Sequence, residues 1–298
     1  MTNVLQSIEP KRSEIAPGVS VWRALPTRAR RLVGAWCFLD HFGPVEDEAM
    51  HAFDVGVHPH IGLQTATWLF DGALLHRDSL GSVQPVRAGE LNLMTAGQGI
   101  AHSEHLGADC TRLHGLQFWI ALPEAAREIA PRFEHHAELP QWRAGRVSLR
   151  LFIGEFAGRR SPARVHTPLL GFELHAPAAE TLTLPLDPGF EHALYVASGH
   201  ARHGEVEVPA MRLLVLPLGT AMLHLELAAA TCAVLIGGAP FDEAPLMWWN
   251  FVARRNDEIA AAREDWQAHR RFGDVPDGGV RIAAPAFDLK LRAGGPSP

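Results

Sequence analysis

The chain has 298 residues, of which 47% are hydrophobic and 20% are charged, and its formal net charge is −6. This composition is typical of a globular protein with a substantial core. The negative charge argues against a broad electrostatic surface for nucleic acid, so we expect no direct nucleic-acid partner. The length suffices for two domains or for one large one.

No segment predicts export or membrane insertion. The first eighteen residues lack the apolar core of a signal peptide. The most apolar stretch, residues 213–236, contains His224 and Glu226 and falls short of a spanning helix. Three widely spaced cysteines without a CxxC pair indicate neither a disulfide framework nor a zinc ribbon. We therefore expect a cytoplasmic protein without membrane association.

The first half of the chain reads as short strands separated by Gly and Pro. β-Favouring segments occupy residues 18–42, 55–99 and 114–122. Strands at this spacing, with turn residues between them, indicate a sandwich or a barrel. Four aromatic residues of these segments are expected in the core: Trp68, Phe70, Phe118 and Trp119.

Two short motifs in this half predict a metal site. His58 and His60 flank Pro59, and His102 and Glu104 flank Ser103. Side chains at positions i and i+2 of a strand point to the same face. If the two strands meet in a closed β fold, three imidazoles and one carboxylate converge. Such nitrogen and oxygen donors suit a first-row transition metal.

A bland interpretation competes with the metal site. The chain holds 17 histidines, and a lone His-x-His pair is more often a surface or core feature than a ligand pair. The glycine-rich run around the second motif, with Gly97 and Gly99, favours tight turns between strands and so the metal site. Pro59 fits only at a sheet edge or a strand start, where its missing N–H is harmless.

The roles of the other histidines stay open. His76 and His114 either orient the ligand side chains by hydrogen bonds, or they cap turns or sit in the barrel wall. Four other histidines of this half are expected in loops: His51, His105, His135 and His136.

The pattern loosens at residues 139–145, where we place a domain boundary. The predicted domains are residues 1–138, with the metal site, and residues 145–298. β-Type segments resume after the boundary, and one convincing helix follows late. Asn256 is expected to cap that helix, with Ile259, Ala262 and Trp266 on its apolar face. Trp248 and Trp249 are expected to anchor the C-terminal segment, and residues 293–298 to be frayed.

The second half looks like a degenerate copy of the first. Residues 217–226 align with residues 95–104, which sets His224 and Glu226 opposite His102 and Glu104. Upstream, Pro185 and Asp187 stand opposite His58 and His60. The alternation Leu223, Leu225, Leu227 leaves His224 and Glu226 on the other face of the strand. The second domain is therefore predicted to lack a complete metal site.

Several long runs resemble the pirin family of the cupin superfamily. They are FLDHFGP from Phe38, HPHIGLQTATWLFDG from His58, MTAGQGIAHSEH from Met94 and GLQFWIALP from Gly115. MWWNFVARRNDEIAAAREDWQAHRRFG, from Met247, resembles the family's C-terminal segment. The resemblance covers nearly the whole chain and implies an all-β fold of two tandem cupin (jelly-roll) barrels with a short C-terminal helix. It also implies iron in the first barrel, held by His58, His60, His102 and Glu104.

The resemblance also implies two classes of function. Some family members are dioxygenases that open flavonols such as quercetin with O₂. Others are metal- or redox-sensing regulators that bind a protein partner. For the first class we expect a flavonol-like aromatic substrate, with Glu104 as the catalytic base. Iron(II) is the expected metal; zinc, manganese, nickel, copper and cobalt are the alternatives.

Two departures from the family pattern put the substrate in doubt. Ile61 stands where many members have Arg or Lys, and Gln64 where many have Glu. Glu104 is then the only obvious carboxylate of the motif.

Four ligands on an octahedral ion would leave two positions, for a substrate oxygen and for O₂ or water. A closed tetrahedral zinc site is the alternative, although structural zinc usually prefers cysteine ligands.

Overall fold

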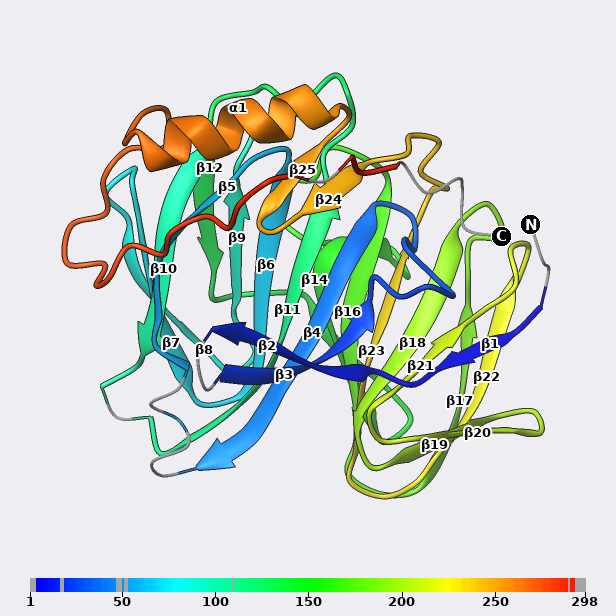
Figure 1. The fold of residues 1–298 in the computed structure, drawn as a ribbon. Helices are drawn as coiled ribbons and strands as arrows, with labels where there is room; N and C mark the ends of the chain where they lie inside the picture. The colour runs from blue at the N-terminus through cyan, green and yellow to red at the C-terminus, as the bar shows by residue number, and fades with distance from the viewer. Residues whose placement is uncertain are drawn as a thin grey trace.

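Two antiparallel β-barrels lie side by side, one from each half of the chain (Figure 1). This computed structural model describes residues 4–16, 19–46, 50, 53–108, 110–288 and 290–292. His51 and residues 293–298, for which the sequence predicts a loop and a frayed tail, lie outside the described residues. The all-β fold of two tandem cupin barrels with a short C-terminal helix is confirmed.

The first barrel packs a seven-stranded sheet against a four-stranded one. In spatial order, the larger sheet consists of β12 (Arg132–His136), β9 (Leu91–Thr95), β6 (Leu63–Asp71), β11 (Arg112–Ala121), β4 (Trp36–Glu46), β3 (Val19–Leu25) and β2 (Lys11–Ala16). The smaller sheet consists of β5 (Val55–His60), β10 (Ile100–Leu106), β7 (Ala73–Asp78) and β8 (Val83–Arg87). His105, His135 and His136 therefore lie on strands, and their predicted placement in loops is wrong.

The second barrel repeats this plan. Its larger sheet consists of β1 (Gln6–Ile8), β21 (Arg212–Val215), β18 (Glu191–Ser198), β23 (Thr231–Gly238), β16 (Leu169–Ala176), β14 (Val147–Phe156) and β13 (Gln141–Ala144), with β15 (Arg159–Arg160) paired to β14. Its smaller sheet consists of β17 (Glu180–Pro185), β22 (Met222–Leu227), β19 (His200–His203) and β20 (Val206–Pro209).

A shared aromatic core joins the barrels. Trp68 of β6 stacks on Phe152 of β14 with ring centroids 4.7 Å apart, and Trp36 meets the same ring edge-on. The Trp36 indole N–H donates to the carbonyl of Gly237 at 3.0 Å. Gly34 has a φ of +54°, and a Cβ there would lie 2.8 Å from the Cα of Gly238. The close contact between the barrels therefore requires glycine at position 34.

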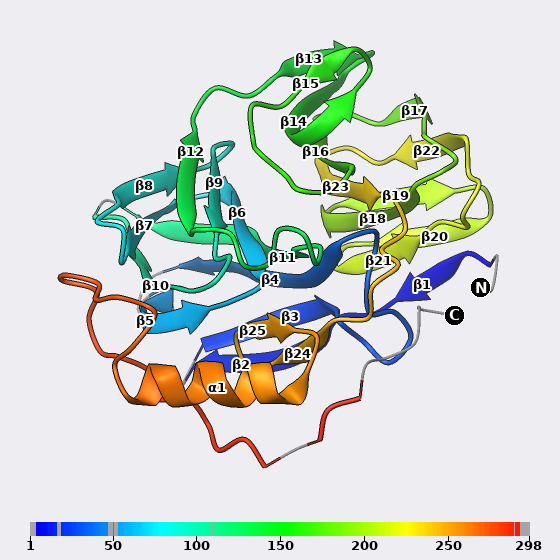
Figure 2. The same ribbon diagram turned by 90° about the horizontal axis from the view of Figure 1, so that it is seen from above.

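Each end of the chain packs on the barrel made by the other half. β1 pairs with β21 of the second barrel. β24 (Leu246–Trp248), β25 (Phe251–Ala253) and α1 (Asn256–Gln267) lie against the first barrel, alongside β5 (Figure 2). Phe251 forms a parallel bridge with Ile61, directly after the His58–His60 pair. The domain boundary predicted at residues 139–145 stays a prediction, because each barrel also includes or contacts a segment from the opposite end of the chain.

The helix α1 buries the predicted face, formed by Ile259, Ala262 and Trp266. The predicted cap is wrong, because Asn256 is already the first helical residue. Its side-chain amide instead exchanges two hydrogen bonds with the backbone of Leu291, at 3.0 and 2.8 Å. Within the described residues, no helix combines the length and the apolarity that a membrane crossing needs.

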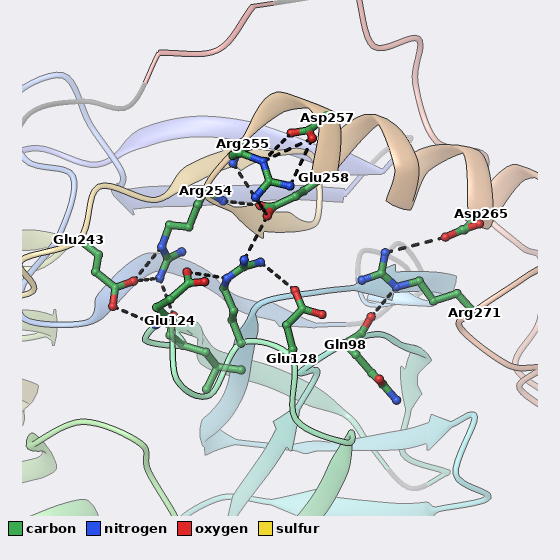
Figure 3. A network of polar contacts seen from close by, with 12 residues as sticks. Gln98, Glu124, Glu128, Glu243, Arg254, Arg255, Asp257, Glu258, Asp265 and Arg271 are labelled. Carbon is green, nitrogen blue, oxygen red and sulfur yellow. Dashed lines mark hydrogen bonds and ion pairs between the residues drawn. The ribbon is translucent and has the colours of Figure 1, made fainter.

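An ionic network ties the start of α1 to the first barrel (Figure 3). Glu258 accepts hydrogen bonds from the backbone N–H groups of Arg254 and Arg255, at 2.9 and 3.1 Å. Its other oxygen pairs with Arg127 of the turn after β11, at 3.1 Å. The network holds the C-terminal segment, and with it the loop before β25, against the first barrel.

Candidate metal centre

Three imidazole rings converge at the edge of the four-stranded sheet. His58 and His60 lie on β5, and His102 lies on β10 as the register partner of His58. One ligand nitrogen from each ring lies within 4.8 Å of the others, and all three residues are buried. The predicted convergence of the three histidines is confirmed. It arises between hydrogen-bonded neighbours in one sheet.

The edge position explains both the proline and the spacing. β5 is the outermost strand of its sheet, so the missing N–H of Pro59 leaves no ladder partner unsatisfied, as expected. The β5–β10 ladder is regular up to His102 and then shifts, since Glu104 pairs with Val55. A bulge of this kind re-aims side chains, and it lies next to the three rings.

Backbone carbonyls set the orientation of the two β5 histidines. Nδ1 of His58 lies 2.8 Å from the carbonyl oxygen of Gly56, and Nδ1 of His60 lies 3.1 Å from that of Asn250. A carbonyl only accepts, so each neutral ring carries its proton on Nδ1 and presents an Nε2 lone pair. For His60 this partner comes from the C-terminal segment.

A second histidine and a carboxylate set the orientation of His102. Nε2 of His76 lies 3.0 Å from Oδ2 of Asp78, and Nδ1 of His76 lies 3.4 Å from Nδ1 of His102. The Asp78 carboxylate accepts from His76 Nε2–H, so in the neutral ring Nδ1 of His76 accepts from His102. His102 then also presents its Nε2 lone pair. His76 thus orients a candidate ligand, one of its two anticipated roles.

Asp78 is itself held in place. Its Oδ1 accepts from the N–H groups of Leu80 and Ser82, at 2.9 and 3.0 Å. Burial acts to raise the pKa of Asp78, but the hydrogen bonds from His76 and Ser82 outweigh it and keep the pKa below its usual value. His76 also stacks on Phe133 with ring centroids 4.3 Å apart. The Asp78–His76 pair therefore combines an ionised Asp78 carboxylate with a His76 ring that is held in place by its stacking on Phe133.

The donor set fits a metal ion. Nε2 of His60 and Nε2 of His102 lie 3.0 Å apart, and the outer hydrogen bonds leave a lone pair on each. Two facing lone pairs repel each other unless a cation lies close to both. Burial lowers the pKa of His58 to about 4 and, with the neighbouring imidazoles, holds the pKa values of His60 and His102 well below their usual value. All three rings are therefore neutral at pH 7, the form that binds metals.

Glu104 lies in the same cavity but outside the tight group. Among the described residues, only His58, His60 and His102 form a cluster of three or more candidate ligands. Oε1 of Glu104 accepts a hydrogen bond from the Thr67 hydroxyl at 3.2 Å. Burial raises the pKa of Glu104 above its ordinary value. Its role as a fourth ligand stays a prediction.

A cavity of about 320 Å³ opens onto the three rings. Its opposite wall is the inner face of the seven-stranded sheet. On this face, the side chains of register partners on neighbouring strands form rows, and one row follows the next every two residues along a strand. Phe38 of β4 and Trp119 of β11 are register partners, and their rings stack with centroids 4.0 Å apart. Trp119 also meets the His60 ring edge-on at 5.3 Å. The space is therefore a slot with an aromatic wall beside the metal-ligand candidates.

Sequence reasoning assigned Trp119 to the core and did not single out the other wall residues. Gln117 and Trp119 share one face of β11, and Phe38 and Asp40 share one face of β4. Their i, i+2 spacing matches that of the histidines and was the available signal. Asn250 had no such signal, because its carbonyl reaches the site from the distant C-terminal segment. Trp249, expected only as an anchor, also lines the cavity.

His114 lies away from the site. Its Nε2 is 2.7 Å from Nε2 of His41, whose Nδ1 lies 2.7 Å from the Tyr195 hydroxyl of the second barrel. His114 therefore belongs to the contact between the barrels, as in the barrel-wall alternative. His105 bonds to Ser103 and Asp54 on the outer face of β10, away from the three rings.

The second barrel has no comparable cluster among its described residues. His224 and Glu226 are exposed on β22, while Leu223, Leu225 and Leu227 are buried, as the alternation predicts. Asp187 is exposed and accepts a hydrogen bond from the backbone of its own turn.

We expect elemental analysis of the purified protein to give one tightly bound transition-metal ion per chain. The physical reason is that, among the residues that the structure describes, only the first barrel brings three candidate imidazole ligands together. Two tight ions per chain would contradict this expectation. His224→Ala is the matched control and should leave the stoichiometry at one.

Two family models match the chain, described as Pirin over residues 18–120 and as Pirin C-terminal cupin domain over residues 171–273. “Putative quercetin 2,3-dioxygenase PA1205” of Pseudomonas aeruginosa is 45% identical over 293 residues, which cover 98% of this chain and 93% of that protein. A “Pirin-like protein” of Caulobacter vibrioides is 39% identical over 258 residues, covering 84% and 88%.

Solved structures match as well. A crystal structure described as quercetin 2,3-dioxygenase from Acinetobacter baumannii superposes with a TM-score of 0.93 at 43% identity, over 97% of each chain. The Escherichia coli pirin YhhW, described as a complex with nickel(II), gives a TM-score of 0.64 at 19% identity, over 80% of this chain and 100% of that one. The second match shows the fold alone.

Proposed function

The chain belongs to the pirin family, and from that premise we propose that it is a metal-dependent dioxygenase that opens a flavonol such as quercetin with O₂. The carrying observation is that three neutral imidazoles present their Nε2 lone pairs to an aromatic-walled cavity of about 320 Å³. The names of the relatives from Pseudomonas aeruginosa and Acinetobacter baumannii support the reaction class. A cytoplasmic location is part of the proposal and agrees with three unpaired cysteines.

His58, His60 and His102 would hold the metal, with Glu104 as the proposed fourth ligand. Imidazole suits iron, zinc, nickel and copper alike, so the donor set does not choose among them. We propose iron(II), with zinc, manganese, nickel, copper and cobalt as alternatives. When bound, the ion would act as a Lewis acid toward a substrate oxygen and support chemistry with O₂. The open cavity beside the rings disfavours a closed structural zinc site.

The protein side chains perform the remaining tasks. Phe38 and Trp119 offer a flat face on which an aromatic substrate can stack. Glu104 is the proposed base, which on loosening from the ion would take the proton of the flavonol 3-hydroxyl onto a carboxylate oxygen. A positioned carboxylate is a common general base in proteins. The Thr67 hydroxyl holds that carboxylate in position.

Oxygen uptake with quercetin tests the proposal. Metal-free protein is loaded separately with iron(II), manganese, cobalt, nickel, copper or zinc, and oxygen consumption and carbon monoxide release are measured. We expect turnover with at least one redox-active metal and none without metal. Stoichiometric metal without turnover of any flavonol would sink the enzyme proposal. That outcome, with redox-dependent capture of a protein partner, would support the alternative function of a metal- or redox-sensing regulator.

Asp78→Asn should weaken metal binding by roughly 10–100-fold, the usual cost of losing an outer partner of a ligand. An amide can donate to Nε2 of His76, which moves the His76 proton to Nδ1 and removes the acceptor for His102. Competition with a chromogenic chelator measures the affinity. The matched control is Asp187→Asn, which changes an exposed aspartate of the second barrel. Unchanged affinity in Asp78→Asn would show that the pair does not support His102.

A further inference from the structure

A row of polar side chains crosses the sheet that forms the cavity wall opposite the three histidines. Arg23 of β3 pairs in register with Asp40 of β4, and Asp40 pairs with Gln117 of β11. Gln117 in turn pairs with Thr67 of β6. The Thr67 hydroxyl lies 3.0 Å from Oε1 of Gln117 and 3.2 Å from Oε1 of Glu104. One end of the row therefore touches the proposed base.

The other end is an ion pair whose carboxylate is buried. Nε and Nη2 of Arg23 donate to the two carboxylate oxygens of Asp40 at 2.9 and 2.7 Å. Asp40 is only 2% exposed, while the Arg23 side chain is 29% exposed. Both residues line the cavity. Burying an ion pair seldom adds stability over apolar packing, so its position on a cavity wall calls for another reason.

The surroundings of the pair resemble a site for an aromatic ring with a polar edge. The Arg23 guanidinium lies 4.5 Å from the centroid of the Phe38 ring, which stacks on Trp119. On the other side of the row, Val21 and Phe42 line the cavity with apolar surface. The polar row is thus bordered by apolar surface on both sides. A ring lying in this slot would therefore meet the polar atoms of the row between two apolar surfaces.

We propose that the Arg23–Asp40 pair, with Gln117, recognises a phenolic hydroxyl on an outer ring of the substrate, away from the oxygens that would face the three histidines. This inference rests on the proposed function. A phenol O–H can donate to a carboxylate oxygen of Asp40, and the phenol oxygen can accept from Arg23. Asp40 lies two strands from Thr67, about 10 Å at the usual strand spacing, so the two recognition points are separated along the cavity.

The consequence is selectivity for hydroxylated flavonols. A hydrogen bond to a charged group contributes enough for roughly a 10- to 150-fold difference in affinity between ligands with and without the hydroxyl. Three probes share the 3-hydroxy-4-keto edge. Quercetin carries hydroxyls on both outer rings, galangin has none on the pendant ring, and 3-hydroxyflavone has none on either.

The test is binding of the three probes to zinc-loaded protein, followed by tryptophan fluorescence. We expect wild-type protein to bind quercetin at least tenfold more tightly than 3-hydroxyflavone. The affinity for galangin shows whether the recognised hydroxyl lies on the pendant ring or on the other outer ring. Asp40→Asn and Arg23→Gln should each bring this preference to within about threefold while 3-hydroxyflavone binds as before. In oxygen-uptake assays, both variants should raise KM for quercetin by a larger factor than they lower kcat. Arg12→Gln, which removes an exposed arginine bonded to Ser20 in the same sheet, is the matched control.

The outcomes separate the two proposals. Equal affinity of wild-type protein for all three probes overturns this inference and leaves the proposed function standing; that arm needs no variant. Equal loss of all three probes in Asp40→Asn and Arg23→Gln also overturns it, because the pair would then only support the fold. No binding of any probe to metal-loaded wild-type protein overturns the flavonol assignment itself.

Discussion

His102→Ala should remove the metal ion proposed for the first barrel, and His58→Ala should do the same. Each change deletes one of three converging nitrogen donors, and Glu104 lies outside their tight group, so only two clustered ligand atoms remain. The loss should exceed the roughly 10–100-fold effect of removing an outer partner such as Asp78. Elemental analysis after dialysis should find less than stoichiometric metal, and oxygen uptake with quercetin should disappear.

His224→Ala controls for the loss of a histidine as such. His224 stands opposite His102 in the repeat, but it is exposed on β22 and, within the described part of the chain, belongs to no cluster of candidate metal ligands. It should keep both metal and turnover. Full metal content in both His58→Ala and His102→Ala would show that the ion, if any, is bound elsewhere.

Glu104→Gln separates metal binding from chemistry. Glutamine keeps the shape and an oxygen that can accept from Thr67, but it removes one negative charge and the base. Three neutral imidazoles still bind a divalent ion, so metal affinity should fall without vanishing. Turnover should fall about a hundredfold or more, the usual contribution of a positioned base.

Metal content, flavonol binding and oxygen consumption are measured on the same Glu104→Gln preparation. Metal and flavonol should bind while little oxygen is consumed. Glu226→Gln, which changes the exposed counterpart in the second barrel, should behave as wild type. A metal-loaded Glu104→Gln protein that turns over at the wild-type rate would remove Glu104 from the mechanism. Another group, such as His76, would then have to take the proton.

Local pattern alone was enough to find the three histidines. Alternation along a strand is set by the backbone, so the i, i+2 spacing of His58 and His60 already places both rings on one face. The same argument correctly placed His224 and Glu226 on the opposite face of β22 from the leucines. The corresponding helical periodicity correctly predicted the buried face of α1. These predictions hold because each depends on only a few consecutive residues.

Contacts between distant parts of the chain decided the rest. The Asn250 carbonyl that orients His60 comes from 190 positions away. Asn256 was predicted as a helix cap by a local rule, but its amide bonds to the backbone of Leu291. Trp119 alternates like a core residue, and only the seating of the smaller sheet leaves a cavity in front of it. Periodicity tells which face of a strand a side chain occupies, whereas closure of the barrel and the crossing of the chain ends decide what that face meets.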